Sequence, residues 1–481
     1  MILVKKISLL LTACLLLGIL NACGQPAETD ETTTTNEVVE KVDLNGYEFR
    51  YLFDGTDTDN IVFGYNRDAT FGDLALSRKA EVEQNLNCKI ELCYSTDLAT
   101  TIKNSIASQT DIYSASQWAN YSFQLQNLIR ADMMLPISEI DSIINFRDNT
   151  DKWGNKYQLE SFLWNNDIYG LLPIQWPEYI YFSLDHLFVV NETLIKNGGF
   201  TDPREFVEKG EWNRTKLREI MEDYTLTTSA GNEQYGLVCN RFHFFDITLR
   251  ASEIELVKKE NGAWVSGIDT PECIDALNWA EDMIYGTGKD YVYPQIVDTY
   301  QAEKAFLEEN AVMLLIHSYF IFQPKSQIAY GMEDFGLLPF PLSDSNKSNN
   351  WIGQHETLMY GVSIPANVEE PDSTAYILNA LYEPLEGYET EEKRLEYYNR
   401  NIFHDTRDAD VFFKTLQINR YTYRYGNTGF LPTSIAQGLS DQKGKKTVIE
   451  YLDSIKAQFE STFDVIIPMY ESMEAVWGME E

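Results

Sequence analysis

Residues 187–221 read LFVVNETLIKNGGFTDPREFVEKGEWNRTKLREIM and predict a strand followed by capped helices. The run 187–190 is short and wholly apolar, which is typical of a buried strand. Asp202 stands before a proline and a glutamate, so its side chain can cap a helix that Gly210 then ends. Asn213 is placed to cap the next helix. This order of elements is the unit from which α/β proteins are built.

The same alternation of strands and helices runs along the rest of the chain. Alternating apolar residues at 47–53 predict a strand, and the spacing of apolar residues at 71–86 predicts an amphipathic helix. Further strands are expected at the apolar runs 89–94, 169–174, 311–317, 335–340 and 358–364, and further helices at 273–284 and 448–459. The prediction is an α/β protein with mixed sheets and helices packed on them.

Composition and charge restrict the partners of this protein. The chain has 481 residues, of which 44% are hydrophobic and 23% are charged, as in globular proteins that contain two domains. Its net charge is −36, so its surface repels nucleic acid and anionic lipid, and we expect no nucleic-acid partner. Aromatic residues reach 13% and recur in polar neighbourhoods, such as 118–121 and 421–425.

The first 44 residues predict export and anchoring. Residues 1–22 have a positive start at Lys5 and Lys6 and then an apolar run too short to span a bilayer, as in a signal peptide. The run ends at Cys23, in a context that resembles the bacterial lipobox, although Asn21 departs from it. Lipidation at Cys23 and a flexible tether over 23–44 would place the protein on the outer face of the cytoplasmic membrane. A soluble secreted form is the alternative.

Metal and catalytic motifs are absent from the sequence. The four cysteines of the folded body are expected to be buried free thiols, because no CxxC pair occurs: Cys88, Cys93, Cys239 and Cys273. HExxH, P-loop and GxSxG motifs are missing, and the five histidines are scattered along the chain. We therefore expect no catalytic residue, no metal and no cofactor.

Taken together, these segments resemble extracellular solute-binding protein family 1, the lipoprotein receptors of carbohydrate ABC importers. Residues 203–213 are similar to the family's P-x-E-L-V-x-x-G-x-W-T stretch, with Asn213 in place of Thr. Residues 169–173 (YGLLP) resemble its YGLP strand, and the segments 67–91, 306–313 and 334–339 complete the pattern. The resemblance extends over nearly all of residues 45–470.

The resemblance implies a periplasmic-binding-protein-like (type II) fold with two α/β lobes, a cleft between them and hinge strands that cross from lobe to lobe. Carried over to this chain, lobe 1 comprises residues 45–180 and 350–425, and lobe 2 comprises 181–349 and 426–481. Hinge closure around a ligand would give the importer a state to recognise. A monomer is expected.

The same resemblance places candidate ligand-binding residues in the cleft. Neutral sugars are held by aromatic faces and planar polar groups, which selects Trp118, Trp176, Glu178, Tyr319, Trp351, Glu356 and Tyr425. Tyr319 is the strongest candidate, because it follows a very apolar strand where the family commonly places a stacking aromatic. For each of these residues a structural role in the core or on a turn is the alternative.

We therefore predict an extracytoplasmic lipoprotein that binds a carbohydrate, preferably an oligosaccharide, and delivers it to the transmembrane subunits of an ABC permease. One alternative is a surface-anchored glycoside hydrolase or lyase. Another is a receptor of the same fold for peptides or other solutes, or one that signals through a membrane kinase. Function resides in the site and not in the fold, so the sequence alone leaves these alternatives open.

Overall fold

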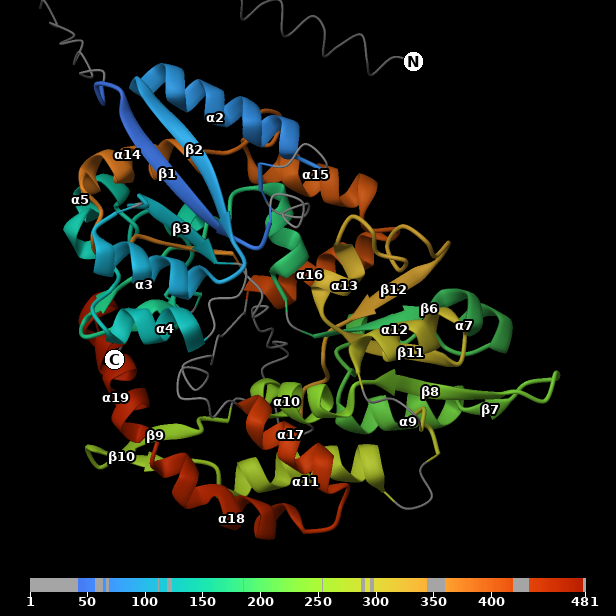
Figure 1. Ribbon diagram of the computed structural model, residues 1–481. Helices are drawn as coiled ribbons and strands as arrows, with labels where there is room; N and C mark the ends of the chain where they lie inside the picture. Colours follow the sequence, from blue (N-terminus) through green and yellow to red (C-terminus); the bar gives the residue numbers. More distant parts are fainter. Residues whose placement is uncertain are drawn as a thin grey trace, which may run out of the picture. The chain divides into compact units, whose positions relative to one another are not determined.

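In the computed structural model, Asp43–Glu481 form one unit built on two principal sheets (Figure 1). The structure describes residues 42–56, 64–65, 69–110, 112–118, 123–156, 158–184, 186–252, 254–286, 290–294, 298–343, 360–417 and 432–478. Cys23, Trp351, Glu356 and Tyr425 lie outside these ranges.

The first sheet has the strand order β13-β3-β1-β2. β1 (Tyr47–Asp54) lies parallel to β2 (Cys88–Ser95) and to β3 (Ala115–Trp118), while β13 (Gly361–Ser363) is antiparallel to β3. The connection from β1 to β2 contains α2 (Gly72–Leu86), which confirms the predicted strand, helix and strand. The sheet is covered by helices that include α3 (Leu98–Ser108), α4 (Phe123–Arg130), α5 (Asp141–Ile144) and α14 (Pro371–Leu381).

The second sheet has the order β12-β6-β11-β8-β7 and comes from the middle of the chain. β11 (Ala311–Ile316) is parallel to β8 (Glu233–Cys239) and antiparallel to β6 (Leu187–Asn191), which in turn pairs with β12 (Phe335–Leu338). β7 (Leu226–Thr227) extends the far edge. The sheet packs against α7 (Glu192–Gly198), α8 (Arg204–Glu208), α9 (Arg214–Tyr224), α12 (Thr299–Leu307) and α16 (Thr406–Gln417).

A group of helices packs below the second sheet. α10 (Arg241–Ala251) contacts both α11 (Pro271–Tyr285) and α17 (Pro432–Gln442), and α18 (Val448–Glu460) packs on α11 (Figure 1). α19 (Phe463–Trp477) then runs to the hairpin of β4 (Leu163–Trp164) and β5 (Asp167–Ile168). The remaining α-helices and strands of the described residues are α6 (Thr150–Trp153), α13 (Ser318–Phe322), α15 (Glu391–Asn401), β9 (Val257–Glu260) and β10 (Ala263–Ser266).

Most of the predicted elements and helix caps are found. The side chain of Asn213 accepts a hydrogen bond from the backbone N–H of Lys216 at 2.9 Å, and Gly210 ends α8 with a φ of 69°. The predicted strand 169–174 is wrong, because this segment makes only an isolated bridge from Leu171 to Val362. Its YGLLP sequence has another role, since a Cβ at Gly170 would lie 2.3 Å from the Phe162 ring.

Cysteine side chains agree in part with the sequence analysis. All four described cysteines are free thiols, and Cys239 and Cys273 are buried as expected. Burial raises the pKa of both thiols to about 12, which makes them unreactive. Cys88 and Cys93 are only half-buried, because β2 lies at the edge of its sheet. The described helices include none with the length and apolarity needed to cross a membrane.

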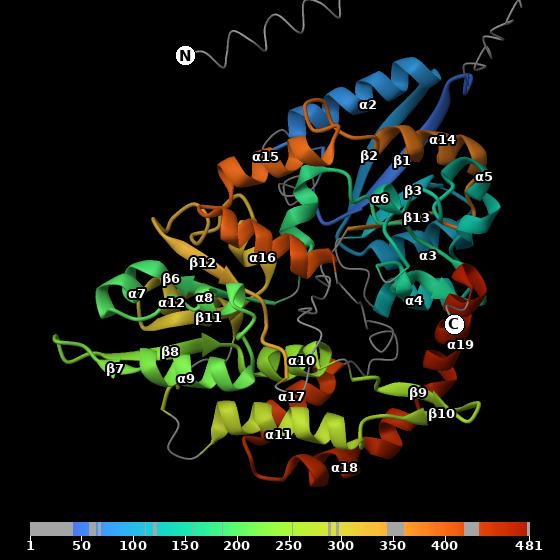
Figure 2. The same ribbon diagram turned by 180° about the vertical axis from the view of Figure 1, so that it is seen from behind.

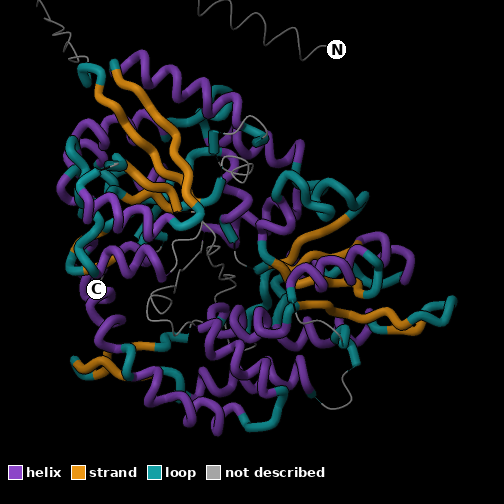
Figure 3. Tube along the Cα trace, viewed as in Figure 1, coloured by secondary structure: helices purple, strands orange, loops and turns teal. Residues whose placement is uncertain are grey.

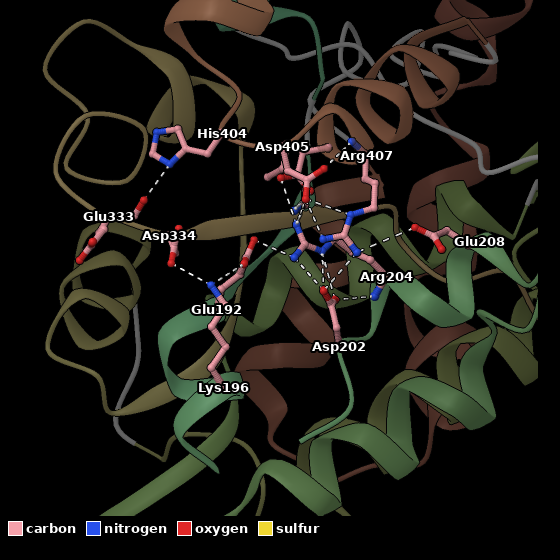
Figure 4. A network of polar contacts seen from close by, with 12 residues as sticks. Glu192, Lys196, Asp202, Arg204, Glu208, Glu333, Asp334, His404, Asp405 and Arg407 are labelled. Atoms are coloured by element: carbon pink, nitrogen blue, oxygen red, sulfur yellow. Dashed lines mark hydrogen bonds and ion pairs between the residues drawn. The ribbon is translucent and has the colours of Figure 1, made fainter. Parts of the chain in front are cut away.

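A buried arginine joins α8, β12 and α16 (Figure 4). Arg204 is 1% exposed, and its guanidinium lies 3.2 Å from Asp408, 2.8 Å from Asp202 and 2.7 Å from Glu192. Burial lowers the pKa of Arg204, but these carboxylates outweigh burial and raise it. Asp408 also accepts the N–H of Leu337 in β12 at 2.8 Å. The network is internal and fully paired, so it is structural.

Figure 2, seen from behind, and the tube in Figure 3 show the two groups of strands as separate sheets, each with its own helices. The first sheet uses strands from residues 47–118 and 361–363, and the second uses strands from 187–338. α16 packs on β12 of the second sheet, although the sequence analysis placed residues 406–417 in lobe 1. The exact lobe boundaries stay a prediction.

Candidate functional site

The carboxyl ends of the parallel strands define where a ligand site is expected. β1 ends at Asp54 and β3 at Trp118 in the first sheet, while β8 ends at Cys239 and β11 at Ile316 in the second. In open α/β sheets, ligands bind outside the carboxyl ends of the strands. The residues that follow these four strands are therefore the first candidates.

Electrostatic interactions link three side chains from these edges. Tyr360 precedes β13, and burial raises its pKa, with further increases from the nearby Tyr319 and Asp54. Tyr319 belongs to α13, which follows β11, whereas Asp54 ends β1. We name Asp54, Tyr319 and Tyr360 the carboxyl-edge cluster. It joins the ends of both sheets through groups that can stack on a ring or pair with hydroxyls.

Tyr319 is half-buried and lies beside other aromatic rings. Its ring meets that of Phe320 edge to face at 5.6 Å, and Phe320 meets Tyr300 at 5.1 Å. Tyr300 is 71% exposed, which is high for so large an apolar side chain. Burial raises the pKa of Tyr319, and Tyr300 adds to the increase, so its hydroxyl is a neutral donor and acceptor.

The backbone that carries Tyr319 is fixed by hydrogen bonds to the segment that leads into β6. Ser318 Oγ donates to the carbonyl of Tyr181 at 3.1 Å and accepts the N–H of Leu184 at 3.2 Å. The N–H of Ser318 donates to the carbonyl of Leu184 at 3.1 Å. α13 also packs against the 3-10 helix Pro177–Phe182. Tyr319 is therefore held on a rigid support, as binding sites require.

Trp118 and Trp176 lie in the core, each with 1% of its surface exposed. The indole N–H of Trp118 donates to Ser116 Oγ at 3.0 Å, and that of Trp176 donates to the Glu383 carbonyl at 3.1 Å. The Trp176 ring packs against other buried aromatic rings, those of Tyr65 and Tyr382. Neither indole presents a face to solvent in this structure, so a ligand role for either stays a prediction.

Glu178 is fully buried in the first turn of the 3-10 helix that follows Trp176. Neither of its carboxyl oxygens has a side-chain partner within the described part of the chain. Burial raises its pKa to about 8. When it is ionised, the Glu178 charge raises the pKa of Tyr388 and of Tyr397 further. These two tyrosines are therefore its electrostatic neighbours. At neutral pH Glu178 is therefore an uncharged acid and a hydrogen-bond donor.

The structure thus brings two of the predicted ligand residues, Tyr319 and the buried Trp118, to the carboxyl edges, and adds Asp54, Tyr300 and Tyr360. The sequence analysis missed these three because Asp54 and Tyr360 reach Tyr319 only through the packing of the sheets. A strand end followed by an acid, as at Asp54, was the available signal. The predictions for Trp351, Glu356 and Tyr425 fall outside the described residues.

A separate surface cavity of about 640 Å³ opens beside β7 and β8, lined by residues that include Gln234, Arg241 and Tyr285. It lies at the outer edge of the second sheet, because β7 is the last strand there. Asp54, Tyr319 and Tyr360 do not line it. We therefore give the carboxyl-edge cluster priority as the functional site.

Solved structures share this architecture over almost their whole length. An ABC substrate-binding protein (Lmo0181) from Listeria monocytogenes, in complex with cycloalternan, matches with a TM-score of 0.54 and 13% identity over 87% of this chain and 99% of the other. The maltose/maltodextrin-binding domain MalE from Bdellovibrio bacteriovorus, bound to maltotriose, matches with a TM-score of 0.53 and 13% identity over 87% and 100%. The chain has the periplasmic-binding-protein fold.

This finding confirms the predicted fold class. UgpB from Mycobacterium tuberculosis, in complex with glycerophosphocholine, has the same fold, with a TM-score of 0.55 and 14% identity over 88% of this chain and 99% of UgpB. Ligands of different chemistry therefore occur on this one architecture. No family model and no curated protein sequence matches the chain.

Proposed function

We propose that this protein is an extracytoplasmic solute-binding lipoprotein that captures a carbohydrate, preferably an oligosaccharide, and delivers it to an ABC importer. The observation that carries the proposal is the carboxyl-edge cluster, in which Tyr360, next to the end of β3, interacts electrostatically with Asp54 at the end of β1 and with Tyr319 after β11. Aromatic rings beside a carboxylate suit neutral sugars, because rings pack on C–H faces while the acid accepts hydroxyl protons. Two binding proteins of the same fold have sugar ligands.

The proposed cleft lies between lobe 1 (45–180 and 350–425) and lobe 2 (181–349 and 426–481). The cleft is proposed to contain Trp118, Trp176, Glu178, Trp351, Glu356 and Tyr425 beside the cluster. Trp118, Trp176 and Glu178 are buried in the present structure and would contact ligand only after the lobes move apart. Hinge opening of this kind is common in binding proteins.

We further propose that residues 1–22 are removed on export, that a lipid on Cys23 tethers the monomer to the outer face of the cytoplasmic membrane, and that no covalent chemistry takes place. The alternatives are a surface glycoside hydrolase or lyase and a receptor for another solute. The glycerophosphocholine complex of UgpB gives the second alternative a specific precedent for this fold.

Thermal unfolding of the purified chain against a ligand panel tests the proposal. The panel holds mono- and oligosaccharides, glycerophosphodiesters, peptides and amino acids. A ligand present at about 100 times its Kd stabilises a protein by roughly 2.7 kcal/mol, which raises the unfolding midpoint measurably. A shift confined to sugars is the expected result. A shift from glycerophosphocholine or peptides alone would overturn the carbohydrate assignment, and release of products from a labelled glycan would favour an enzyme.

A further inference from the structure

Three histidines from separate segments gather at the carboxyl end of the second sheet. His186 directly precedes β6, His317 directly follows β11, and His243 lies in the first turn of α10, just after β8. β6 and β11 are antiparallel, with Leu187 opposite Ile316, so the next pair outward is His186 and His317. Side chains of directly opposed residues lie on the same face, which brings these two imidazoles together.

The three rings are close enough to share one ion. The ring centroids lie 4.2 Å apart for His186 and His317, and 4.5 Å apart for each of the other two pairs. One ring nitrogen from each histidine lies within 4.8 Å of the other two. Tetrahedral zinc with Zn–N bonds of about 2.0–2.1 Å separates its nitrogen ligands by about 3.4 Å. Small rotations of the imidazoles therefore suffice to reach that geometry.

The surroundings suit a cation held by neutral ligands. His186 and His243 are each 5% exposed, whereas His317 is partly exposed and gives access from solvent. On α10, Asp246 and Arg250 form a buried ion pair at 2.8 Å, so their charges offset one another. Arg241 of the same helix donates a hydrogen bond to the Pro294 carbonyl at 3.0 Å, so its guanidinium is engaged outside the three histidines.

We propose that His186, His243 and His317 bind one divalent transition-metal ion, with Zn²⁺ as the first candidate. Neutral imidazole is a preferred ligand of zinc, copper, nickel and cobalt, whereas Ca²⁺ and Mg²⁺ prefer oxygen. Three protein ligands leave a fourth position for water or a ligand atom. The ion would tie β6, β11 and α10 together, next to Ser318 and Tyr319. The proposal rests on the three imidazoles and does not depend on a carbohydrate ligand.

Calorimetric titration of Zn²⁺ into the full chain, prepared metal-free and without a histidine tag, tests the site. We expect one ion per chain, and Co²⁺ at the same site should show the visible absorption of a tetrahedral complex. Each of His186→Gln, His243→Gln and His317→Gln should weaken binding at least about tenfold, because loss of even an outer-shell partner costs about 10–100-fold in metal affinity. His404→Gln is the matched control, since His404 contacts the backbone carbonyls of Glu333 and Ala329 instead.

The outcomes are decisive in both directions. Absence of saturable Zn²⁺ binding overturns the proposal. Zn²⁺ binding that none of the three substitutions weakens also overturns it, as does a loss of affinity in His404→Gln as large as in the three variants. Circular dichroism of each variant shows whether it is folded. If a buried variant fails to fold, His317→Gln decides, because His317 lies at a partly exposed strand end. Sugar binding has no part in this readout, so failure here leaves the proposed function untouched.

Discussion

Replacing Glu178 by glutamine should make the protein more stable, and increasingly so as the pH rises. Burial raises the pKa of this carboxyl from 4.5 to about 8. In the unfolded chain the group loses its proton near its ordinary value, whereas the folded protein keeps the proton to a higher pH. Unfolding therefore releases a proton within this interval, and the free energy of unfolding falls as the pH rises from about 4.5 to about 8.

The size of the effect follows from the pKa shift. One pKa unit corresponds to about 1.4 kcal/mol, so the full shift gives an upper bound of roughly 5 kcal/mol above the folded-state pKa. Glutamine has nearly the same shape and does not ionise. Wild type and Glu178→Gln should therefore be about equally stable below the ordinary pKa, and the variant should gain up to this amount at alkaline pH.

Urea unfolding of the proteins from about pH 2 to above about pH 8 measures the difference and covers the titration of both groups. Glu389→Gln is a control of opposite sign, because a hydrogen bond from Lys393 lowers the pKa of the exposed Glu389 to about 2. That carboxylate stabilises the fold above its ordinary pKa, and its contribution is lost as the pH falls through about 2. A stability difference between wild type and Glu178→Gln that does not change with pH would refute the reasoning.

Three further changes test the packing. Gly336→Ala should cost about 1–3 kcal/mol, because its Cβ would lie 2.7 Å from Arg204 Nη1, and chemical denaturation would show the loss. Arg204→Met should lower the free energy of unfolding by about 3–5 kcal/mol, because Asp408 stays buried without its ion-pair partner. The double variant Arg204→Met/Asp408→Asn should regain part of that stability. Equal stability of the single and double variants would argue against the ion pair. Trp176→Ala should cost about 3–5 kcal/mol and lower the unfolding midpoint, whereas Tyr319→Ala should leave that midpoint nearly unchanged; the reverse order would exchange their roles.

Local sequence patterns were enough to predict most of the elements. The alternation at Tyr47–Asp54 and the capping residue Asn213 each act over a few residues, so their effects are visible in the sequence. The strand prediction for 169–174 was wrong because it used only local pattern: the apolar run is buried but does not form a regular strand. Periodicity alone cannot separate these two cases.

Spatial neighbours of the site were harder to predict. The approach of His186 to His317 depends on strand pairing between segments far apart in the chain, and the interaction of Tyr319 with Tyr360 depends on how the two sheets pack. The burial of Trp118 and Trp176 was also hard to predict, because a polar neighbourhood in sequence does not show which face of a ring is covered. Trp176 stands beside proline and glutamate, yet its ring packs against Tyr65 and Tyr382.

The most direct test of the central claim is a calorimetric titration of the best sugar from the panel into wild type, Tyr319→Ala and Phe200→Ala. Phe200 lines a separate surface pocket between α7 and α9 and serves as the control. We predict one saturable site in wild type. Tyr319→Ala should bind the sugar at least tenfold more weakly, a loss of binding free energy on the order of 1.4 kcal/mol, and Phe200→Ala should bind it as wild type does. Saturable binding that Tyr319→Ala leaves intact, or no binding of any sugar, would contradict a carbohydrate site at the carboxyl edges.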